Sequence, residues 1–321
     1  MDLTSLRAVL ADLRGEVLPS RFEKAQQPQP STLQLGFRTL ERFIWIEICW
    51  HADAPRLVQI QSPYKQGSES TLAKQIQHGL RKLALIDLSQ YGFERVVEFG
   101  LALRPGDPIH RTLVLEMMGR HSNLLLLDQN RKVITLGRQV RNYQSRIRPI
   151  GTGDLYVPPP PLQGIEPSQK ESLKKWKARL CLIPTTLKNA LQQSYQGISP
   201  SIAIQLAHDE ASMALNLLER PVLDISEEDW QKLHRRWCLW LQRLEQEDFV
   251  LCFNGPTPFR VWSTEENISA SKELSLSLGN YYREHLESHQ LTKVTKELQK
   301  KILRGKKGEE KSLIEQEELL E

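Results

Sequence analysis

Four short apolar segments, separated by turns too short to hold a helix, constrain the fold of this 321-residue chain more than any other feature. They occupy residues 93–103, 111–119, 123–128 and 132–137, and the first two alternate apolar with polar residues. Such alternation is typical of strands with one buried face. Parallel strands need a crossover of about a dozen residues, so these segments predict an antiparallel sandwich or barrel-like sheet.

The first ninety residues predict further elements of the same domain. Apolar residues at helical spacing run over residues 3–18, and Asp2 precedes them in the position of an N-cap. Strand patterns are expected near residues 33–37, 43–50 and 56–61, followed by a helix over 69–84.

A run of four prolines at residues 158–161 ends this region, and such a run is stiff and extended, as a linker should be. Beyond it the apolar spacing becomes helical, and from residue 278 the sequence turns polar with mixed charge, which is typical of a coiled coil. We therefore predict an α+β protein with an N-terminal domain at 1–157, a linker at 158–165, a helical middle domain at 166–277 and the start of a coiled coil at 278–321.

The positive charge of the chain gathers in its N-terminal half. Residues 1–160 hold 21 Lys+Arg against 15 Asp+Glu, a net of +6, whereas residues 161–321 hold 22 against 24, a net of −2. Within residues 129–150 no acid occurs, and Tyr143 lies among six basic residues, namely Arg131, Lys132, Arg138, Arg141, Arg146 and Arg148. Such a stripe can attract a phosphate backbone, and it can equally be a solvated loop.

A second candidate for phosphate binding is the segment YQGISPSIA at residues 195–203. A turn at Gly197 leads to Ser199 as N-cap and Pro200 as the first helical residue. The amides of a helix start can hold a phosphate. The alternative is an ordinary well-capped turn between two helices.

No metal site, cofactor or enzyme motif is indicated. Two pairs of possible metal ligands, His234 with Cys238 and His285 with His289, lack the further ligands that zinc requires. The four cysteines show no CxxC spacing, which favours free thiols in a reducing cytoplasm. The chain has no apolar run of about 18 residues and a charged N-terminus, so we expect neither a membrane span nor secretion, and a cytoplasmic location.

Five stretches of the chain form a recognisable series: MDLTSLRAVLADLR, QYGFERVVEFG, LVLEMMGRHSNLLLLDQNRKVITLGRQV, RPIGTGDLYVPPPP and YQGISPSIAIQLA. Taken in this order, they resemble the NFACT family of ribosome quality-control proteins, which includes RqcH-like proteins and proteins with the older label of FbpA-type fibronectin-binding. The block around Glu116 and residues 119–123 is the most specific of them, and the resemblance spans essentially the whole chain.

This resemblance implies a fold and a function. The fold is an N-terminal β-sandwich with flanking helices, similar to that of the Fpg/MutM DNA glycosylases, then a helix-hairpin-helix middle domain and a coiled coil. The function is binding of tRNA, alanyl-tRNA in bacteria, and of a large ribosomal subunit obstructed by peptidyl-tRNA, in support of template-free C-terminal tailing of the stalled chain. The ribosome makes the peptide bond, so the resemblance implies an RNA-binding factor and no enzyme; helper proteins are not identified.

The resemblance also implies site residues. An acid near the N-terminus falls on Asp2, and the family's Asp-Arg pair, associated with tRNA, falls on Glu94-Arg95, where the acid is one methylene longer. Without the resemblance, Glu94-Arg95 reads as part of an outward-facing cross-strand ion pair. The other tRNA candidates are Arg120, His121, Arg138 and Arg141, and Gly197 and Ser199 are candidates for rRNA or phosphate.

Family members continue through a long coiled coil into another domain, so we expect this chain to be a fragment, a truncated gene product or a reduced member of the family. If it is truncated, we expect tRNA binding to be retained and ribosome binding to be weakened. A fibronectin-binding adhesin is one alternative and a catalytically inactive Fpg-like nucleic-acid-binding protein another. A working glycosylase would need an N-terminal proline as nucleophile, whereas here Met1 is followed by Asp2.

Overall fold

The computed structural model describes residues 1–64, 70–141, 148–265 and 273–286, together with residues 295, 299 and 302. The chain divides into two compact units, Met1–Leu276 and Ser277–Glu321. Residues 274–286 are helical. Most of the predicted coiled coil at 278–321 lies outside the described residues, as do Tyr143 and Arg146. The coiled coil and the boundaries at 157 and 166 stay predictions.

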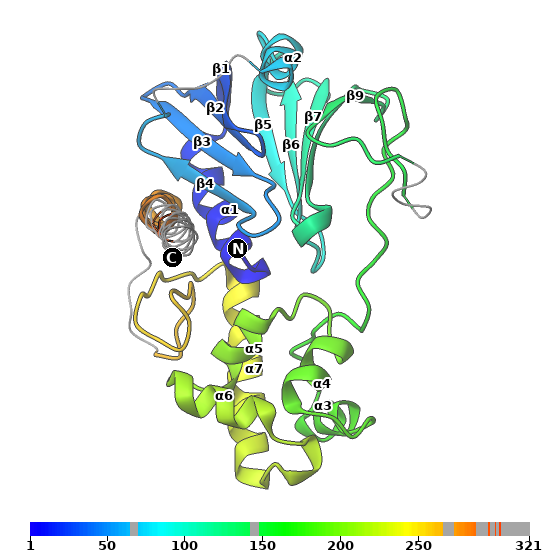
Figure 1. The fold of residues 1–321 in the computed structure, drawn as a ribbon, viewed down its shortest axis with the longest axis vertical. Coiled ribbons are helices and arrows are strands. Elements are labelled where there is room, and N and C mark those ends of the chain that lie inside the picture. Colours follow the sequence, from blue (N-terminus) through cyan, green and yellow to red (C-terminus); the bar gives the residue numbers. More distant parts are fainter. Residues whose placement is uncertain are drawn as a thin grey trace, which may run out of the picture. The chain divides into compact units, whose positions relative to one another are not determined.

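Within the described part of the chain, nine strands form one sheet in which every pairing is antiparallel (Figure 1). Their order in the sheet is β4-β3-β2-β1-β5-β6-β7-β8-β9. The strands are β1 (Ser20–Gln29), β2 (Thr32–Arg38), β3 (Phe43–Cys49), β4 (Arg56–Ile60), β5 (Ala84–Ser89), β6 (Val96–Ala102), β7 (Arg111–Glu116), β8 (Asn123–Leu127) and β9 (Val133–Leu136). The predicted antiparallel sheet is confirmed.

The sheet folds over at the seam between β1 and β5, where only two residue pairs connect the strands. The two halves approach each other closely, since a Cβ at Gly137, after β9, would lie 2.7 Å from the ring of Trp50, after β3. Helix α1 (Leu3–Val17) packs against β4 and β5, and α2 (Thr71–Gly79) packs against β1 and β9. The result is a β-sandwich flanked by helices, as expected for the α+β class.

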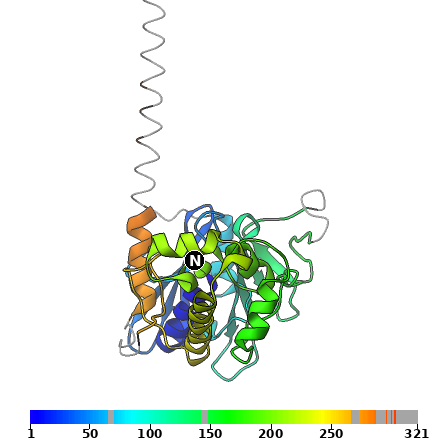
Figure 2. The same ribbon diagram turned by 90° about the horizontal axis from the view of Figure 1, so that it is seen from below.

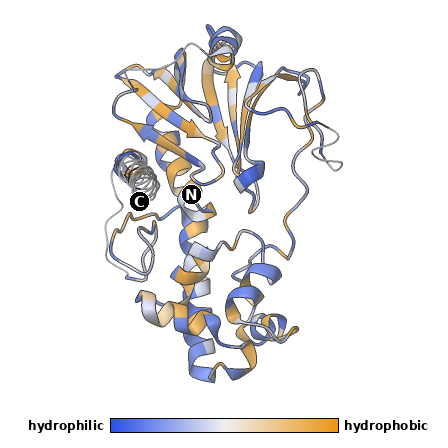
Figure 3. Cartoon of the chain, viewed as in Figure 1, coloured by the Kyte–Doolittle hydropathy of each residue, from blue (hydrophilic) through white to orange (hydrophobic). Residues whose placement is uncertain are grey.

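The apolar patterns explain which faces are buried. In α1 the residues at helical spacing, such as Leu6, Leu10 and Leu13, are fully buried, while Asp2 caps the helix by accepting from the Ser5 amide at 2.8 Å. All five residues of β8 are buried, as the continuous apolar run of an interior strand requires. In Figure 3 helix α1 and strands β5 and β6 show much of the hydrophobic colour.

Two strands differ from the sequence-based expectation. β1 went unpredicted because its sequence, SRFEKAQQPQ, is largely polar and shows no clear alternation. The apolar spacing predicts a helix over 69–84, whereas α2 ends at Gly79 and the strand β5 begins at Ala84. Lys82 adopts a left-handed conformation with φ of 67°, and a right-handed helix cannot continue through such a residue. The carbonyl of Leu83 instead accepts a hydrogen bond from the amide of Phe22 in β1.

The remainder of the first unit is helical, and in Figure 2 its green and yellow helices lie in front of the blue and cyan strands. The helices are α3 (Leu173–Leu180), α4 (Leu187–Ser194), α5 (Pro200–Ala207), α6 (Ala211–Glu219) and α7 (Glu227–Gln246). Residues 208–210 separate α5 from α6. After α7, residues 248–264 contain an isolated bridge, Cys252 to Arg260. Helix α7 reaches the sandwich, where the Trp240 indole donates to the Thr4 hydroxyl at 2.9 Å.

Candidate functional site

A cavity of about 460 Å³ lies where the start of β6 meets the turn between α4 and α5. Glu94 and Arg95 line it from the sandwich, and Gly197 and Ser199 line it from the helical region. About one hundred residues separate these two pairs in the sequence. The fold therefore brings together the Glu-Arg pair and the glycine turn that the sequence marked independently.

Arg95 is the cationic group of this cavity. Its Nη1 donates to the carbonyl of Met1 at 3.0 Å, and its own carbonyl accepts from the Met117 amide at 2.9 Å. Burial lowers the pKa of the Arg95 guanidinium, and the negative charges of Asp2 and Glu94 partly offset this effect. Asp2 is almost fully buried and is engaged as the cap of α1, so it acts on Arg95 through its charge.

Glu94 faces a different partner. Its Oε1 accepts a hydrogen bond from the backbone amide of Leu162 at 2.8 Å, and its backbone carbonyl accepts from the Gln90 side chain at 2.7 Å. Leu162 directly follows the proline run. The carboxylate of Glu94 and the guanidinium of Arg95 thus have separate backbone partners, the amide of Leu162 and the carbonyl of Met1.

Gly197 lets the helical region approach the sandwich. Its φ of +75° is a left-handed conformation, and a Cβ there would lie 2.8 Å from Cδ2 of Leu3 and 3.1 Å from Phe93. Glycine satisfies both constraints because it lacks that atom. Ser199 caps α5 as predicted, since its hydroxyl accepts from the Ile202 amide at 3.2 Å.

The GRHSN segment forms a turn beside the cavity, with Arg120 and His121 exposed and Ser122 and Asn123 buried. It begins after Met118, which lines the cavity, and contains a single 3₁₀ turn, Gly119–His121. The Asn123 side chain accepts from the Arg138 amide at 2.9 Å and donates to the Arg138 carbonyl at 2.8 Å. The Arg138 guanidinium in turn donates to the Arg120 carbonyl at 2.8 Å. Arg120, His121 and Arg138 are therefore held together as an exposed basic rim, which we call the GRHSN rim.

Two residues of the basic stripe at 131–148, Arg131 and Arg148, have carboxylate partners within the fold. Arg131 forms two hydrogen bonds to Glu98 at 2.8 and 2.7 Å. Arg148 forms two to the buried Glu116 at 2.9 and 2.5 Å, and the Tyr156 hydroxyl donates to the same carboxylate at 2.9 Å. Two members of the stripe therefore hold the fold together.

The rest of the stripe differs in its exposure. Lys132 and Arg141 are exposed, like Arg138 in the GRHSN rim. Arg146 lies outside the described residues. Of the described members of the stripe, Lys132, Arg138 and Arg141 are therefore exposed, and Arg138 also belongs to the GRHSN rim.

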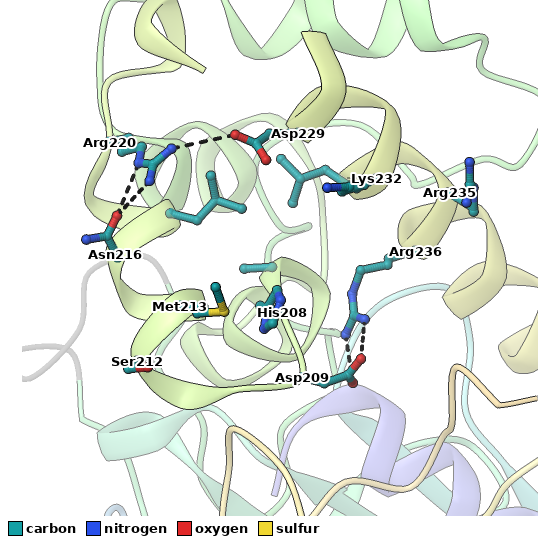
Figure 4. Close-up of a pocket in the computed structure, with 13 residues that line it drawn as sticks. His208, Asp209, Ser212, Met213, Asn216, Arg220, Asp229, Lys232, Arg235 and Arg236 are labelled. Atoms are coloured by element: carbon teal, nitrogen blue, oxygen red, sulfur yellow. Dashed lines mark hydrogen bonds and ion pairs between the residues drawn. The ribbon is translucent and has the colours of Figure 1, made fainter. Parts of the chain in front are cut away.

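The sequence did not indicate a second cavity, of about 700 Å³, in the helical region (Figure 4). Helices α6 and α7 and the break at residues 208–210 line it. Figure 4 shows Arg236 directed at Asp209, while Arg220 is directed at Asn216 and Asp229. The three polar residues His208, Asp209 and Glu210, which lie between two apolar runs, are the sequence feature that marks the break between α5 and α6.

Asp209 is the centre of an ion cluster in that cavity. Arg236 donates to both of its carboxylate oxygens, at 2.7 and 3.2 Å, and Arg260 donates to one of them. Burial acts to raise the pKa of Asp209, but the hydrogen bonds from the two arginines outweigh it and lower the pKa to about 2. The cluster joins the α5–α6 break to α7 and to the segment after it, so its role is to hold this arrangement.

The described residues contain neither a cluster of metal ligands nor a helix suited to cross a membrane. The Cys238 thiol lies 3.7 Å from Nε2 of His234, but within the described residues no group of three or more His, Cys, Asp or Glu side chains could hold a metal ion. His289 lies outside those residues. The four cysteines are free thiols. None of the described helices combines the length and apolar composition that crossing a bilayer requires.

Comparison with known families gives one match to nearly the whole chain. The model described as NFACT N-terminal and middle domains matches residues 2–321. Relatives named "Rqc2 homolog RqcH" include one from Streptococcus suis, 25% identical over 98% of this chain and 54% of its own length, and one from Streptococcus pneumoniae, 27% identical over 63% of this chain and 37% of its own. The chain thus spans about half the length of the first of these relatives.

Solved structures show the same fold. The N-terminal part of a fibronectin/fibrinogen-binding protein from Streptococcus suis matches with a TM-score of 0.62 at 21% identity, covering 88% of this chain and 99% of that one. A fibrinogen-binding protein from Staphylococcus aureus matches with a TM-score of 0.60 at 18% identity, covering 85% and 96%. At these identities the likeness concerns the fold alone.

Proposed function

Because the chain belongs to the NFACT family, we propose that it acts in ribosome-associated quality control as an RNA-binding factor. In this proposal it binds tRNA, with alanyl-tRNA expected, and the large ribosomal subunit obstructed by peptidyl-tRNA. Binding supports template-free addition of a C-terminal alanine tail to the stalled chain. A role at the ribosome would place the protein in the cytoplasm.

The names of the relatives support the general role. Proteins named as homologues of Rqc2 match at 25–27% identity. Since the chain spans about half the length of the first of them, activities of the whole relatives, including subunit binding and tailing, come to this chain as parts of the proposal. We assign it no catalytic residue, because the peptide bond would be formed by the ribosome.

The observation that carries the proposal is the convergence of Arg95, Gly197 and Ser199 on one cavity beside the GRHSN rim. Within the described residues Arg95 uses only Nη1 in a side-chain hydrogen bond, so Nε and Nη2 are available to a ligand. A guanidinium with two free donor positions suits a phosphate or the edge of a base. The exposed Arg120 and Arg138 add attraction for the backbone that does not depend on sequence.

The proposal is tested by crosslinking and sequencing the RNA bound in cells by the wild-type chain and by two single variants. Arg95→Ala removes the cation of the cavity. Arg104→Ala removes an exposed arginine from the opposite end of β6 and changes the net charge equally. We expect tRNA to be enriched on the wild type and on Arg104→Ala, and to be depleted on Arg95→Ala.

Two results would overturn the proposal. One is the absence of tRNA enrichment on the wild-type chain. The other is equal enrichment on Arg95→Ala and Arg104→Ala. Retention of fibronectin by the purified chain, together with no tRNA enrichment, would instead favour the adhesin alternative.

A further inference from the structure

A short segment after the proline run forms one wall of the Arg95 cavity. Leu162 and Gln163 line the cavity, and we refer to residues 162–164 as the strap. The strap's carbonyls accept hydrogen bonds from the Gln196 side chain, at 3.2 Å to Leu162 and 3.1 Å to Gly164. The helical region thus holds the strap by its carbonyl groups.

The strap is attached to the sandwich through Glu94. Residues 158–161 are prolines, which have no N–H to donate, so Leu162 carries the first amide after the linker. That amide donates to Oε1 of Glu94 at 2.8 Å. Glu94 therefore connects the start of β6 to the wall of the cavity, across 68 residues of sequence.

We propose that Glu94 is a positioning residue whose reach, and not its charge, sets the wall of the Arg95 cavity. The part of this inference that concerns RNA rests on the proposed function, and the part that concerns the strap does not. The carboxylate of Glu94 accepts from Leu162, while Arg95 donates to the carbonyl of Met1. The neighbouring acid is thus occupied with the strap instead of orienting the guanidinium.

Two conservative variants separate reach from charge. Glu94→Asp keeps the charge but is shorter by one C–C bond of about 1.5 Å, which would lengthen the 2.8 Å contact well beyond hydrogen-bonding distance. Glu94→Gln loses the charge but keeps a carbonyl oxygen at the same distance from the backbone. If reach matters, Gln should preserve the strap and Asp should release it.

Hydrogen exchange measures the strap directly. Because residues 158–161 carry no amide hydrogen, a proteolytic peptide covering 158–164 reports exchange at residues 162, 163 and 164 alone. We expect Glu94→Asp to speed exchange of this peptide about five-fold, the effect of losing one net hydrogen bond, and Glu94→Gln to change it less than about two-fold.

A matched control is available on the same strand. Glu98→Asp makes the same shortening at a carboxylate that bonds Arg131 and not the strap. It should leave exchange of the 158–164 peptide unchanged. If Glu98→Asp speeds that exchange as much as Glu94→Asp, or if Glu94→Asp exchanges like the wild type, the positioning role is refuted.

Binding of purified tRNA to the same variants gives the functional readout. We expect Glu94→Gln to bind like the wild type and Glu94→Asp to bind several-fold more weakly. The opposite ranking, with Asp retained and Gln weakened, would show that charge matters and would overturn the proposal. If the wild type itself binds no tRNA, the proposed function fails, while the exchange experiment still decides whether Glu94 holds the strap.

Discussion

Replacing Gly197 by alanine tests how closely the helical region packs against the sandwich. The variant adds one Cβ, which would lie 2.8 Å from Cδ2 of Leu3 and 3.1 Å from two atoms of Phe93. Leu3 begins α1, Phe93 lies just before β6, and the side chain of Leu3 is fully buried. The new atom therefore has to displace packed side chains or separate the two regions.

The expected cost has two parts. A residue with a Cβ at a φ of +75° costs about 1–2 kcal/mol, and overpacking of a tight contact costs about 1–3 kcal/mol more. We therefore expect Gly197→Ala to lower the free energy of unfolding by about 2–5 kcal/mol. Since the cavity lies at this contact, binding of tRNA should weaken as well.

Gly106→Ala is the matched control. Gly106 has a φ of +94°, also left-handed, but a Cβ there would meet nothing within 4 Å. It should lose only the conformational part, about 1–2 kcal/mol. Urea unfolding followed by tryptophan fluorescence reports both variants, because Trp237 and Trp240 are buried in α7. Equal losses in the two variants would refute the proposed close packing at Gly197.

Four further outcomes follow from the ion pairs and the rim. Glu116→Gln should lower the free energy of unfolding by about 2–4 kcal/mol, because Glu116 is 1% exposed and accepts from three donors. Glu98→Gln, which alters a more exposed pair, should cost less than about 1 kcal/mol in the same urea titration. The pKa of Asp209 is lowered to about 2 in the folded protein, so the stability that its carboxylate provides should be present above about pH 4 and be lost as the pH falls toward 2. The urea midpoints of the wild type and of Asp209→Asn should therefore converge between about pH 4 and pH 2. Arg120→Ala should weaken tRNA binding most at low salt and reduce its salt dependence, and an unchanged salt slope would exclude a phosphate contact.

Part of the architecture could be predicted because its signals are local. The alternation at 93–103 and 111–119 and the apolar segments at 123–137, joined by short turns, predicted antiparallel strands. The spacing over residues 3–18, with Asp2 before it, predicted α1 and its cap, as the structure has them. Each of these patterns records which side of a strand or helix is buried. β1 escaped this reasoning because its polar residues show no such side.

The sequence by itself therefore determined the class of fold, the family pattern and the elements that carry the candidate residues. Only the tertiary structure decided which partner each polar group has. Arg148 is bound by Glu116, and Glu94 is bound by Leu162, 68 residues away, instead of by its neighbour Arg95. Periodicity reports burial along one element, whereas the choice of partner depends on which distant segments the packing brings within 3 Å, and no local pattern encodes that.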